Sequence, residues 1–347
     1  MKARTSVHDV PLTDPLRPAA ASPGLRPLIR FTIETGDGSL GHGEAAPLVA
    51  YDGVSVDRVL EALATHTSTL ATYEWPEEDV RAACAEVDPL PQALAAVDMA
   101  LWDLAGRREG KNVGELLGVG DAPPIAVNAT IGAVAPDAAA AEAGAAQQAG
   151  FGCVKVKVGT PDDRQRLQAI RDAVGPEVLL RVDANGAWDQ MTAPERIRAL
   201  SRFDIELFEE PVHGQQAIEV VAQRVPKFAL AIDESASANL GTFAHRFCTA
   251  VCLKIASSGG ISGLISDAAA ARSAGYEVYI ASTLDGPLGI AAALHAAAAV
   301  RPDRHCGLAT LARFAHAVPA ALEPASGQMR MPAGPGLGDD LLGWYGE

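Results

Sequence analysis

The first part of the chain arranges apolar and polar positions in a way that predicts two short strands followed by helices. Residues 30–35 have the composition of a strand, and the Asp37-Gly38 pair after them is typical of a hairpin turn into a second short strand. Residues 56–70 and 91–118 have helical sequence, and in the second segment the apolar residues recur at helical spacing. We therefore expect an α+β unit at the start of the chain.

From Pro123-Pro124 onward the pattern changes to short apolar strands that alternate with alanine-rich helices. Eight strand-like runs begin near residues 125, 153, 179, 205, 230, 250, 278 and 305, which are about 20 to 28 residues apart. Each interval has room for one strand, one helix and two short loops. We therefore expect a parallel (β/α) barrel. Residues 329–342 are loop-like, and we expect them to return to the first unit.

Charged side chains stand near the ends of the predicted barrel strands. Lys155 and Lys157 lie on the second strand, and Lys254 lies on the sixth. The third, fourth and fifth strands end in carboxylates: Asp183, Glu209 and Asp233. The adjoining Glu210 and Glu234 are weaker candidates than Glu209 and Asp233, because successive side chains along a strand point to opposite faces. Because the carboxyl ends of barrel strands open on one rim, we expect the three carboxylates to converge there.

Carboxylates gathered at one point repel each other at low dielectric and need a cation. Each one taken alone could equally be a solvated loop charge or a helix cap, but three in register favour a common site. An all-oxygen ligand set is typical of Mg²⁺, with Mn²⁺ as the other candidate. A divalent ion between lysines suits abstraction of a proton α to a carboxylate, because the metal stabilises the enediolate while a lysine takes the proton.

The lysines on the second strand have two interpretations. Alternation in residues 154–158 puts the valines on one face and the lysines on the other, as in an edge strand with solvated lysines. However, only six of the 28 basic residues are lysines. Lysine at three strand positions therefore indicates a need that arginine cannot meet, since a guanidinium does not deprotonate near neutral pH. We expect Lys155 and the metal to lower the pKa of Lys157, which then acts as the base.

Other residues near the predicted rim have a functional and a structural interpretation. Arg181 either orients the metal carboxylates or forms an ion pair inside the barrel. Asn185 either supports the ligands or belongs to a turn. Gly259 and Gly260 follow the sixth strand and either line the substrate pocket or form a tight loop.

Composition and charge exclude several other classes of protein. The formal net charge of −15 disfavours nucleic acid and anionic membranes as partners. The apolar run Leu288–Val300 is too short to span a membrane, and the N-terminal segment has no apolar stretch of the kind found in secretory signals. Five scattered cysteines without a CxxC pair favour a reducing compartment. We expect a cytoplasmic protein that acts on a small-molecule carboxylate, with the oligomeric state left open.

Several motifs together resemble the enolase superfamily, and the resemblance covers nearly the whole chain. They are GHGEAAPL (41–48), AAVDMALWDLAGR (95–107), VKVKVG (154–159), RVDANGAW (181–188), FEEPV (208–212), AIDES (231–235) and LKIASSGG (253–260). A lysine base with Mg²⁺ at an enediolate is this superfamily's pattern. The resemblance implies a modified TIM barrel, (β/α)7β, over residues 123–317. It also implies an α+β capping domain built from residues 1–122 and the tail 318–347.

Within the superfamily, the lysine pattern resembles the muconate lactonizing enzyme subgroup. Residues 278–286 lack the histidine that the mandelate racemase type would carry. In this subgroup the chain is most similar to the o-succinylbenzoate synthases. Three features support this similarity: Arg181, the brief first loop and the segment GLAT at 307–310. The latter segment lacks the DxD motif usual in dipeptide epimerases. N-acylamino acid racemases share the catalytic core, and racemase activity is the main alternative, alone or beside the first.

The resemblance implies a role for each candidate residue. Asp183, Glu209 and Asp233 would bind the Mg²⁺ that holds the substrate carboxylate. Lys157 would remove the α-proton from 2-succinyl-6-hydroxy-2,4-cyclohexadiene-1-carboxylate and then protonate the departing hydroxyl, a lyase reaction of menaquinone biosynthesis. Lys254 would stabilise the enediolate from the opposite face, and Lys155 would tune Lys157. Substrate contacts are expected from four residues: Ser282, Thr283, Gly259 and Gly260. The loop 45–51 should close over the substrate.

Two hypotheses about other kinds of function stay open. A Schiff-base aldolase would use Lys157 or Lys254 as a nucleophile and would need no metal. A small-molecule binder without activity would keep the cavity and lose the chemistry, although none of the three carboxylate positions is broken in this sequence.

Overall fold

An antiparallel sheet of three strands opens the chain. In the computed structural model, which describes residues 1–13, 24–74, 80–236 and 246–346, β1 (Lys2–Pro11) pairs with β2 (Leu25–Glu34). β2 in turn pairs with β3 (Leu40–Ala45), and Gly38 adopts a positive φ of 84° in the intervening turn. The predicted hairpin is thus confirmed. The sequence did not indicate β1, because most of its side chains are exposed and it has no continuous apolar face.

Helices follow this sheet along the chain: α1 (Val49–Asp52), α2 (Val56–Leu70), α3 (Val80–Val87), α4 (Pro91–Glu109) and α5 (Val113–Leu116). Of these, α4 packs against β2 and β3, and α2 packs against β1. α2 has the bounds that the sequence predicts, whereas the second helical segment divides into α4 and α5 at Gly110. A side chain at Gly43 would lie 2.0 Å from the Ala96 carbonyl oxygen, so glycine lets β3 approach α4 closely. The buried apolar residues between sheet and helices form a core of their own.

Seven parallel strands form the second sheet in chain order. They are β5 (Ala129–Ile131), β6 (Cys153–Lys157), β7 (Leu179–Asp183), β8 (Ile205–Glu209), β9 (Leu230–Ile232), β10 (Ala250–Leu253) and β11 (Glu277–Ile280). The predicted eighth strand is reduced to single bridges, from Cys306 to Val127 and from Gly307 to Ala281, which join the last strand region to the first. The curled sheet and the separate antiparallel sheet make a modified TIM barrel with a capping domain.

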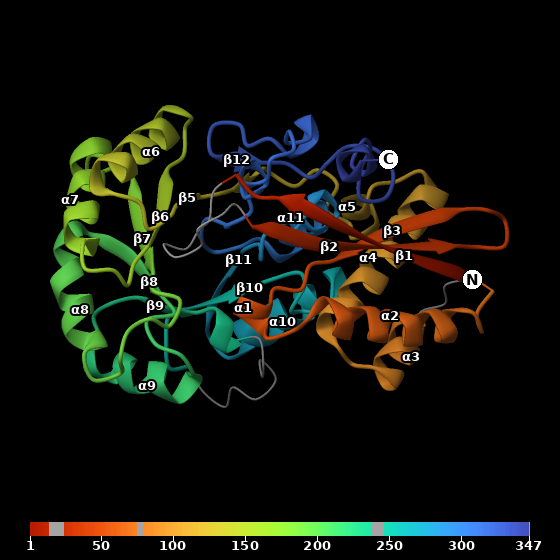
Figure 1. Cartoon of the computed structure of the whole chain (residues 1–347), viewed down its shortest axis with the longest axis horizontal. Coiled ribbons are helices and arrows are strands. Elements are labelled where there is room, and N and C mark those ends of the chain that lie inside the picture. The colour runs from red at the N-terminus through yellow and green to blue at the C-terminus, as the bar shows by residue number, and fades with distance from the viewer. Residues whose placement is uncertain (14–23, 75–79, 237–245, 347) are drawn as a thin grey trace.

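Six helices alternate with the strands and surround the sheet (Figure 1). They are α6 (Pro136–Gln148), α7 (Asp163–Val174), α8 (Ala193–Leu200), α9 (Gln215–Arg224), α10 (Ile261–Ser273) and α11 (Pro287–Val300). Short 3-10 helices follow at Ser201–Phe203, Glu234–Ala236, Leu311–Arg313, Ala320–Leu322 and Leu342–Tyr345. The buried side chains of Leu207, Ala231, Ala250, Cys252, Tyr279 and Ala281 fill the interior of the ring.

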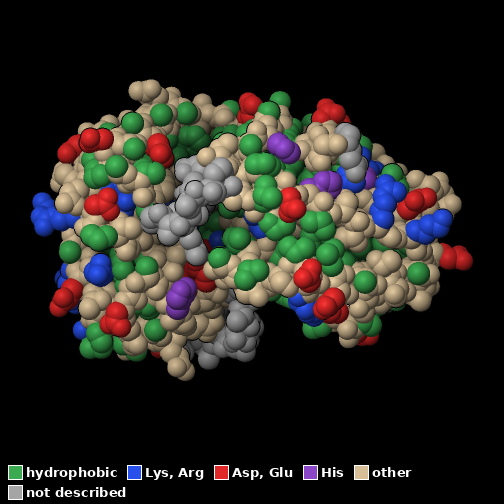
Figure 2. All heavy atoms as spheres, in the orientation of Figure 1, with side chains coloured by type: hydrophobic (Ala, Val, Ile, Leu, Met, Phe, Trp, Pro, Cys, Tyr) green, Lys and Arg blue, Asp and Glu red, His purple; other side chains and the backbone are tan. Residues whose placement is uncertain are grey.

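The C-terminal tail packs against the first part of the chain. β12 (Gln328–Met329) pairs with β4 (Ile125–Ala126), and farther on Gly336 exchanges backbone hydrogen bonds with Lys111 and Val113. The tail thus contacts residues 111–126, while its membership of a capping domain and the domain boundaries at 122 and 318 stay predictions. Acidic and basic side chains are dispersed over the face seen in Figure 2. Among the described helices, none has the length and apolar character needed to cross a membrane.

Candidate active site

The charged residues predicted from the strand ends come together at one end of the barrel. The parallel register pairs Lys157 with Asp183, and Asp183 with Glu209, so these three side chains stand on adjacent strands at the same level. Asp233 follows β9 and Lys254 follows β10. Parallel strands of equal register bring their last residues to a common rim, which is why a regular spacing in sequence became a cluster in space.

The lysines form ion pairs with all three carboxylates. Lys155 Nζ lies 2.6 Å from Glu209 Oε1 and 2.8 Å from Asp183 Oδ2. Lys157 Nζ lies 2.6 Å from the same Asp183 oxygen, and Lys254 Nζ lies 2.8 Å from Asp233 Oδ2. Since one ammonium group contacts both Asp183 and Glu209, the oxygens of these two carboxylates are only a few ångströms apart. The expected convergence of acidic groups between lysines is therefore present.

Burial makes the carboxylates electrostatically unequal. Burial would raise the pKa of Asp183, but the charges of Lys155 and Lys157 outweigh it and hold that pKa below its usual range. Burial raises the pKa of Glu209 to about 7, with help from Asp183 and Asp233 and against the opposing effect of Lys155. For Lys155 and Lys254 burial favours the neutral form, yet the neighbouring carboxylates raise both pKa values. The neighbouring lysines therefore do not fully compensate the negative charge that Glu209 would carry when ionised.

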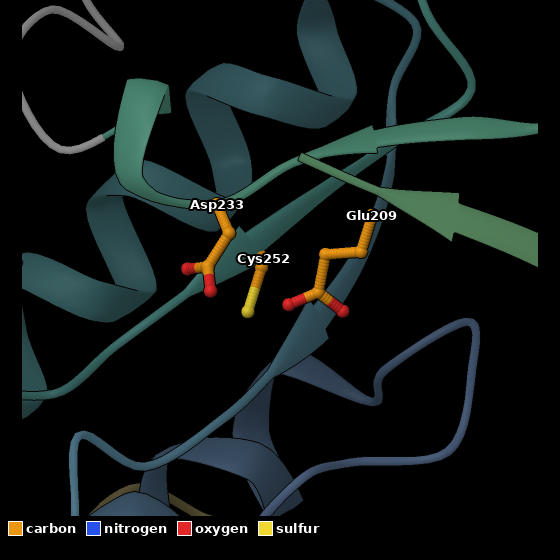
Figure 3. Close-up of side chains that lie close together, drawn as sticks. All are labelled: Glu209, Asp233 and Cys252. Atoms are coloured by element: carbon orange, nitrogen blue, oxygen red, sulfur yellow. The ribbon is translucent and has the colours of Figure 1, made fainter. Parts of the chain in front are cut away.

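The donor atoms at this point fit a hard divalent cation. Glu209 Oε2 is buried and has no hydrogen-bond donor among the described residues. Donor atoms of Glu209, Asp233 and Cys252 lie within 4.8 Å of one another, and their side chains point toward a common centre (Figure 3). A cation such as Mg²⁺ would satisfy the free oxygen and supply the missing positive charge. Asp183, which shares Lys155 with Glu209, would complete the all-oxygen set.

The capping domain contributes a residue that sequence reasoning missed. Tyr51, on α1, donates a hydrogen bond of 2.8 Å from its hydroxyl to Asp233 Oδ1. Its ring lies under the ammonium group of Lys254, with Nζ 4.4 Å from the ring centroid. The sequence indicated only that the loop 45–51 lies near the substrate. No local pattern singles out this tyrosine, because its partners are far away along the chain.

A cavity of about 350 Å³ lies between the cap and the charged cluster. Its walls include the predicted residues Lys155, Lys157, Asn185, Asp233, Lys254, Ser282 and Thr283. Leu12, Leu48 and Tyr51 close it from the cap side, while Gly307 and Thr310 come from the eighth barrel position. A concave space with mostly apolar surface and a few charged groups is typical of a small-molecule site.

Asn185 and Glu210 support the charged groups from unusual backbone positions. Asn185 has a φ of 44°, accepts a hydrogen bond of 2.7 Å from Lys157 Nζ and donates one of 2.8 Å to Glu234 Oε1. Glu210 has a φ of 38° and accepts a hydrogen bond from the backbone N–H of Asp233. Left-handed backbone at non-glycine residues is costly and is found most often at functional sites. Both residues hold reactive groups in place.

Five predicted residues do not line the cavity: Asp183, Glu209, Arg181, Gly259 and Gly260. Asp183 and Glu209 still contact Lys155, which does line it, whereas the other three lie farther away. Of the two interpretations of Arg181, the structure shows the interior ion pair and not the contact with the metal carboxylates: its Nε lies 2.6 Å from Glu206 Oε2, near the start of β8. The side chain begins two residues below Asp183 and turns away from the rim toward this acid. Gly259 and Gly260 follow β10, but they face the cap helices, where a side chain at Gly260 would meet Asp98 at 2.4 Å. They are not among the residues that line the described cavity.

Both parts of the chain match families of known proteins. Residues 138–342 match the family described as enolase C-terminal domain-like, and residues 2–118 match the mandelate racemase / muconate lactonizing enzyme N-terminal domain. The L-Ala-D/L-Glu epimerase of Bacillus subtilis (strain 168) is 30% identical over 97% of this chain and 96% of its own length. The o-succinylbenzoate synthase of Thermobifida fusca (strain YX) is 35% identical over 56% of this chain and 61% of its own.

A solved structure extends the likeness to the whole fold. The dipeptide epimerase from Enterococcus faecalis V583, complexed with Mg and the dipeptide L-Leu-L-Tyr, superposes with a TM-score of 0.84. The two chains are 25% identical, and the match covers 97% of this chain and 98% of the other.

Proposed function

The chain belongs to the enolase superfamily and is an enzyme of that superfamily, and on this premise we propose that it abstracts the proton α to a carboxylate of a small substrate. The reaction we assign is that of an o-succinylbenzoate synthase, in which water is lost from 2-succinyl-6-hydroxy-2,4-cyclohexadiene-1-carboxylate. This assignment is finer than the racemase, epimerase and cycloisomerase chemistry common to the relatives.

One observation carries the proposal: two lysines from well-separated strands line the same cavity, with the carboxylates between them. Lys157 ends β6 and Lys254 follows β10, and three strands lie between β6 and β10 in the sheet. A substrate carboxylate seated above Glu209 would therefore have an amine on either side. Tyr51 covers the Lys254 side, which keeps water from this amine.

The residues of this chain have defined tasks in the dehydration. A bound Mg²⁺ would draw electron density from the substrate carboxylate and so make the α-proton more acidic. Lys157 takes this proton as the Cα–H bond breaks. The same ammonium group then gives the proton to the departing hydroxyl as the C–O bond breaks, so that water leaves and the ring becomes aromatic. Lys254 remains an ammonium group and stabilises the negative charge across the ring.

The cavity wall supports a substrate without a free amino group. At the eighth barrel position the wall is formed by Gly307 and Thr310, and the described residues of the cavity place no carboxylate there. An ammonium group at that end would find no charged partner among the described residues that line the cavity. Thr283 donates its hydroxyl proton to Asp285, and Thr310 donates its own to Ser282. The hydroxyl of Ser282 accepts this bond and another from the backbone N–H of Asp285, and it keeps its proton for a neutral carbonyl or a carboxylate on a succinyl arm.

Racemisation of an N-acylamino acid is the second candidate, because Lys254 is placed as well as Lys157 to exchange a proton. In that reaction one lysine removes the α-proton from one face and the other returns a proton to the opposite face. Both reactions start with the same bond cleavage, and one chain can perform both.

A panel of substrates tests the proposal. The wild type is assayed with the cyclohexadiene carboxylate, with an N-succinyl amino acid and with L-Ala-L-Glu, each with Mg²⁺ and after treatment with EDTA. We expect Mg²⁺-dependent dehydration. Epimerisation of the free dipeptide as the main activity would overturn the substrate assignment, and activity that survives EDTA would overturn the metal-assisted chemistry.

Two variants separate the roles of the lysines. Lys157→Met should lose dehydration by a factor of about 10² to 10⁴, since it removes the base. Lys254→Arg retains a fixed cation, so dehydration should survive in part while racemisation falls by a similar large factor. The exposed Lys227 gives the matched control, and Lys227→Arg should change neither rate. Equal loss of both reactions in Lys254→Arg would contradict a purely electrostatic role for Lys254 in dehydration.

A further inference from the structure

A cysteine inside the barrel lies against two of the proposed metal ligands. Cys252 is on β10, two residues before Lys254, so its side chain faces the interior of the ring as Lys254 does. Its sulfur lies within 4.8 Å of a carboxylate oxygen of Glu209 and of Asp233. Figure 3 shows the sulfur between the two carboxylates. The proposed reaction gives the thiol of Cys252 no role.

The surroundings of the thiol are those of a ligand set and not only of a packing position. Cys252 and Glu209 are 3% and 1% exposed, and Glu209 Oε2 has no donor among the described residues. A buried carboxylate oxygen without a partner is costly, and here it belongs to a side chain aimed at the same centre as the sulfur. Among the described residues, this is the one group of three His, Cys, Asp or Glu side chains spaced to hold a metal.

The three donors differ in the metals they prefer. Carboxylate oxygens bind Mg²⁺ and zinc alike, but a thiolate selects soft or borderline ions and contributes nothing to Mg²⁺. Two oxygens and one sulfur, with a fourth position left for water, match the tetrahedral preference of zinc. Cadmium, a softer ion of the same charge, suits the sulfur still better.

We propose that Glu209, Asp233 and Cys252 form a binding site for a thiophilic divalent cation such as Zn²⁺ or Cd²⁺. Binding breaks the S–H bond of Cys252, releases the proton to solvent and forms a bond between the metal and the sulfur. Because Glu209 and Asp233 belong to both sets, this ion and Mg²⁺ exclude each other. The same pocket thus accepts a hard ion for catalysis and a soft ion that blocks it. The inference goes beyond the proposed reaction and does not depend on the substrate.

Cadmium alone is the probe, because a thiolate bound to Cd²⁺ gives a charge-transfer band in the ultraviolet that a carboxylate does not. The full-length, metal-free protein is titrated with Cd²⁺. We expect a band that saturates at one equivalent and that excess Mg²⁺ removes. Absence of the band in the wild type would overturn the proposal, and so would a band that excess Mg²⁺ leaves unchanged.

Variants then assign the band to one sulfur. Cys252→Ser and Cys252→Ala should both lose it, whereas Cys153→Ser, at a buried cysteine on β6, should retain it. Circular dichroism checks that each variant is folded. A band that persists in a folded Cys252 variant would overturn the proposal. The spectroscopic readout needs no substrate, so failure of the proposed reaction would leave this result unaffected.

Discussion

Glu44 offers the sharpest link between charge and stability in this protein, at the contact between cap and barrel. It lies on β3 and is 1% exposed. Its carboxylate accepts a hydrogen bond of 2.7 Å from the backbone N–H of Gly286 and another from the hydroxyl of Tyr345. Burial, reinforced by the charge of Asp285, raises the pKa of Glu44 to about 7. The Glu44 side chain therefore connects β3 to Gly286 and to Tyr345, and its raised pKa favours the protonated carboxyl.

The perturbation is Glu44→Gln, which keeps an acceptor for Gly286 and removes the titrating proton. The pKa of Glu44 is higher in the folded protein, about 7, than its ordinary value of 4.5. Between these two values the folded state holds the proton more tightly, so wild-type stability falls as pH rises through this window and levels off above it. The full difference corresponds to about 3 kcal/mol. Glutamine mimics the protonated carboxyl and should not contribute to this fall.

Urea unfolding of wild type and variant between about pH 5 and about pH 8 measures the effect as a difference in the free energy of unfolding. Taking the difference cancels the other titrating groups. We expect Glu44→Gln to gain stability relative to wild type as pH rises. Tyr345→Phe is the matched control: it keeps the carboxyl and removes a hydrogen bond that lowers the pKa of Glu44, so the fall should persist. A difference between wild type and Glu44→Gln that is independent of pH would refute the reasoning.

Two further predictions concern the cap. Tyr51→Phe retains the ring beneath Lys254 but removes the hydrogen bond to Asp233. We therefore expect kcat/KM in steady-state assays to fall by about tenfold. An unchanged kcat/KM would show that the hydroxyl has no role in turnover. Arg26 is buried and donates to the carbonyls of residues 46, 47, 283 and 284. Arg26→Lys reaches fewer of them and should lose about 2 to 4 kcal/mol of unfolding free energy in urea, and a raised KM should accompany this loss. A loss below about 1 kcal/mol would mean that these carbonyls find other donors.

The barrel was predictable from sequence because its strands are buried on both sides. Runs such as residues 153–158 and 179–183 are short, apolar and regularly spaced, and the intervening helices fix their direction. β1 was not predictable in this way, because it pairs along one edge of β2 and exposes most of its side chains. The last barrel position was predicted as a strand but forms only the bridges of Cys306 and Gly307, since two residues suffice to close the ring.

The charged cluster was predictable for a related reason: equal spacing along parallel strands becomes proximity at the rim. The same logic fails for residues whose partners come from elsewhere in the chain. Tyr51 contacts Asp233 across the boundary between cap and barrel, and nothing near position 51 indicates this. Arg181 has the right parity for the rim, but its long side chain reaches Glu206 instead, a choice that spacing alone does not reveal.

The ion pair of Arg181 has a consequence for how molecules reach the lysines. Arg181 and Tyr279 are each 1% exposed and stack inside the ring, with the guanidinium carbon 5.4 Å from the ring centroid. Because they block the barrel below the reactive groups, we expect substrate and product to pass on the side of the cap, where Leu48 and Tyr51 line the cavity. Product must then leave by this path before the next substrate molecule can bind. If product release along this path limits turnover, a more viscous solvent should lower kcat.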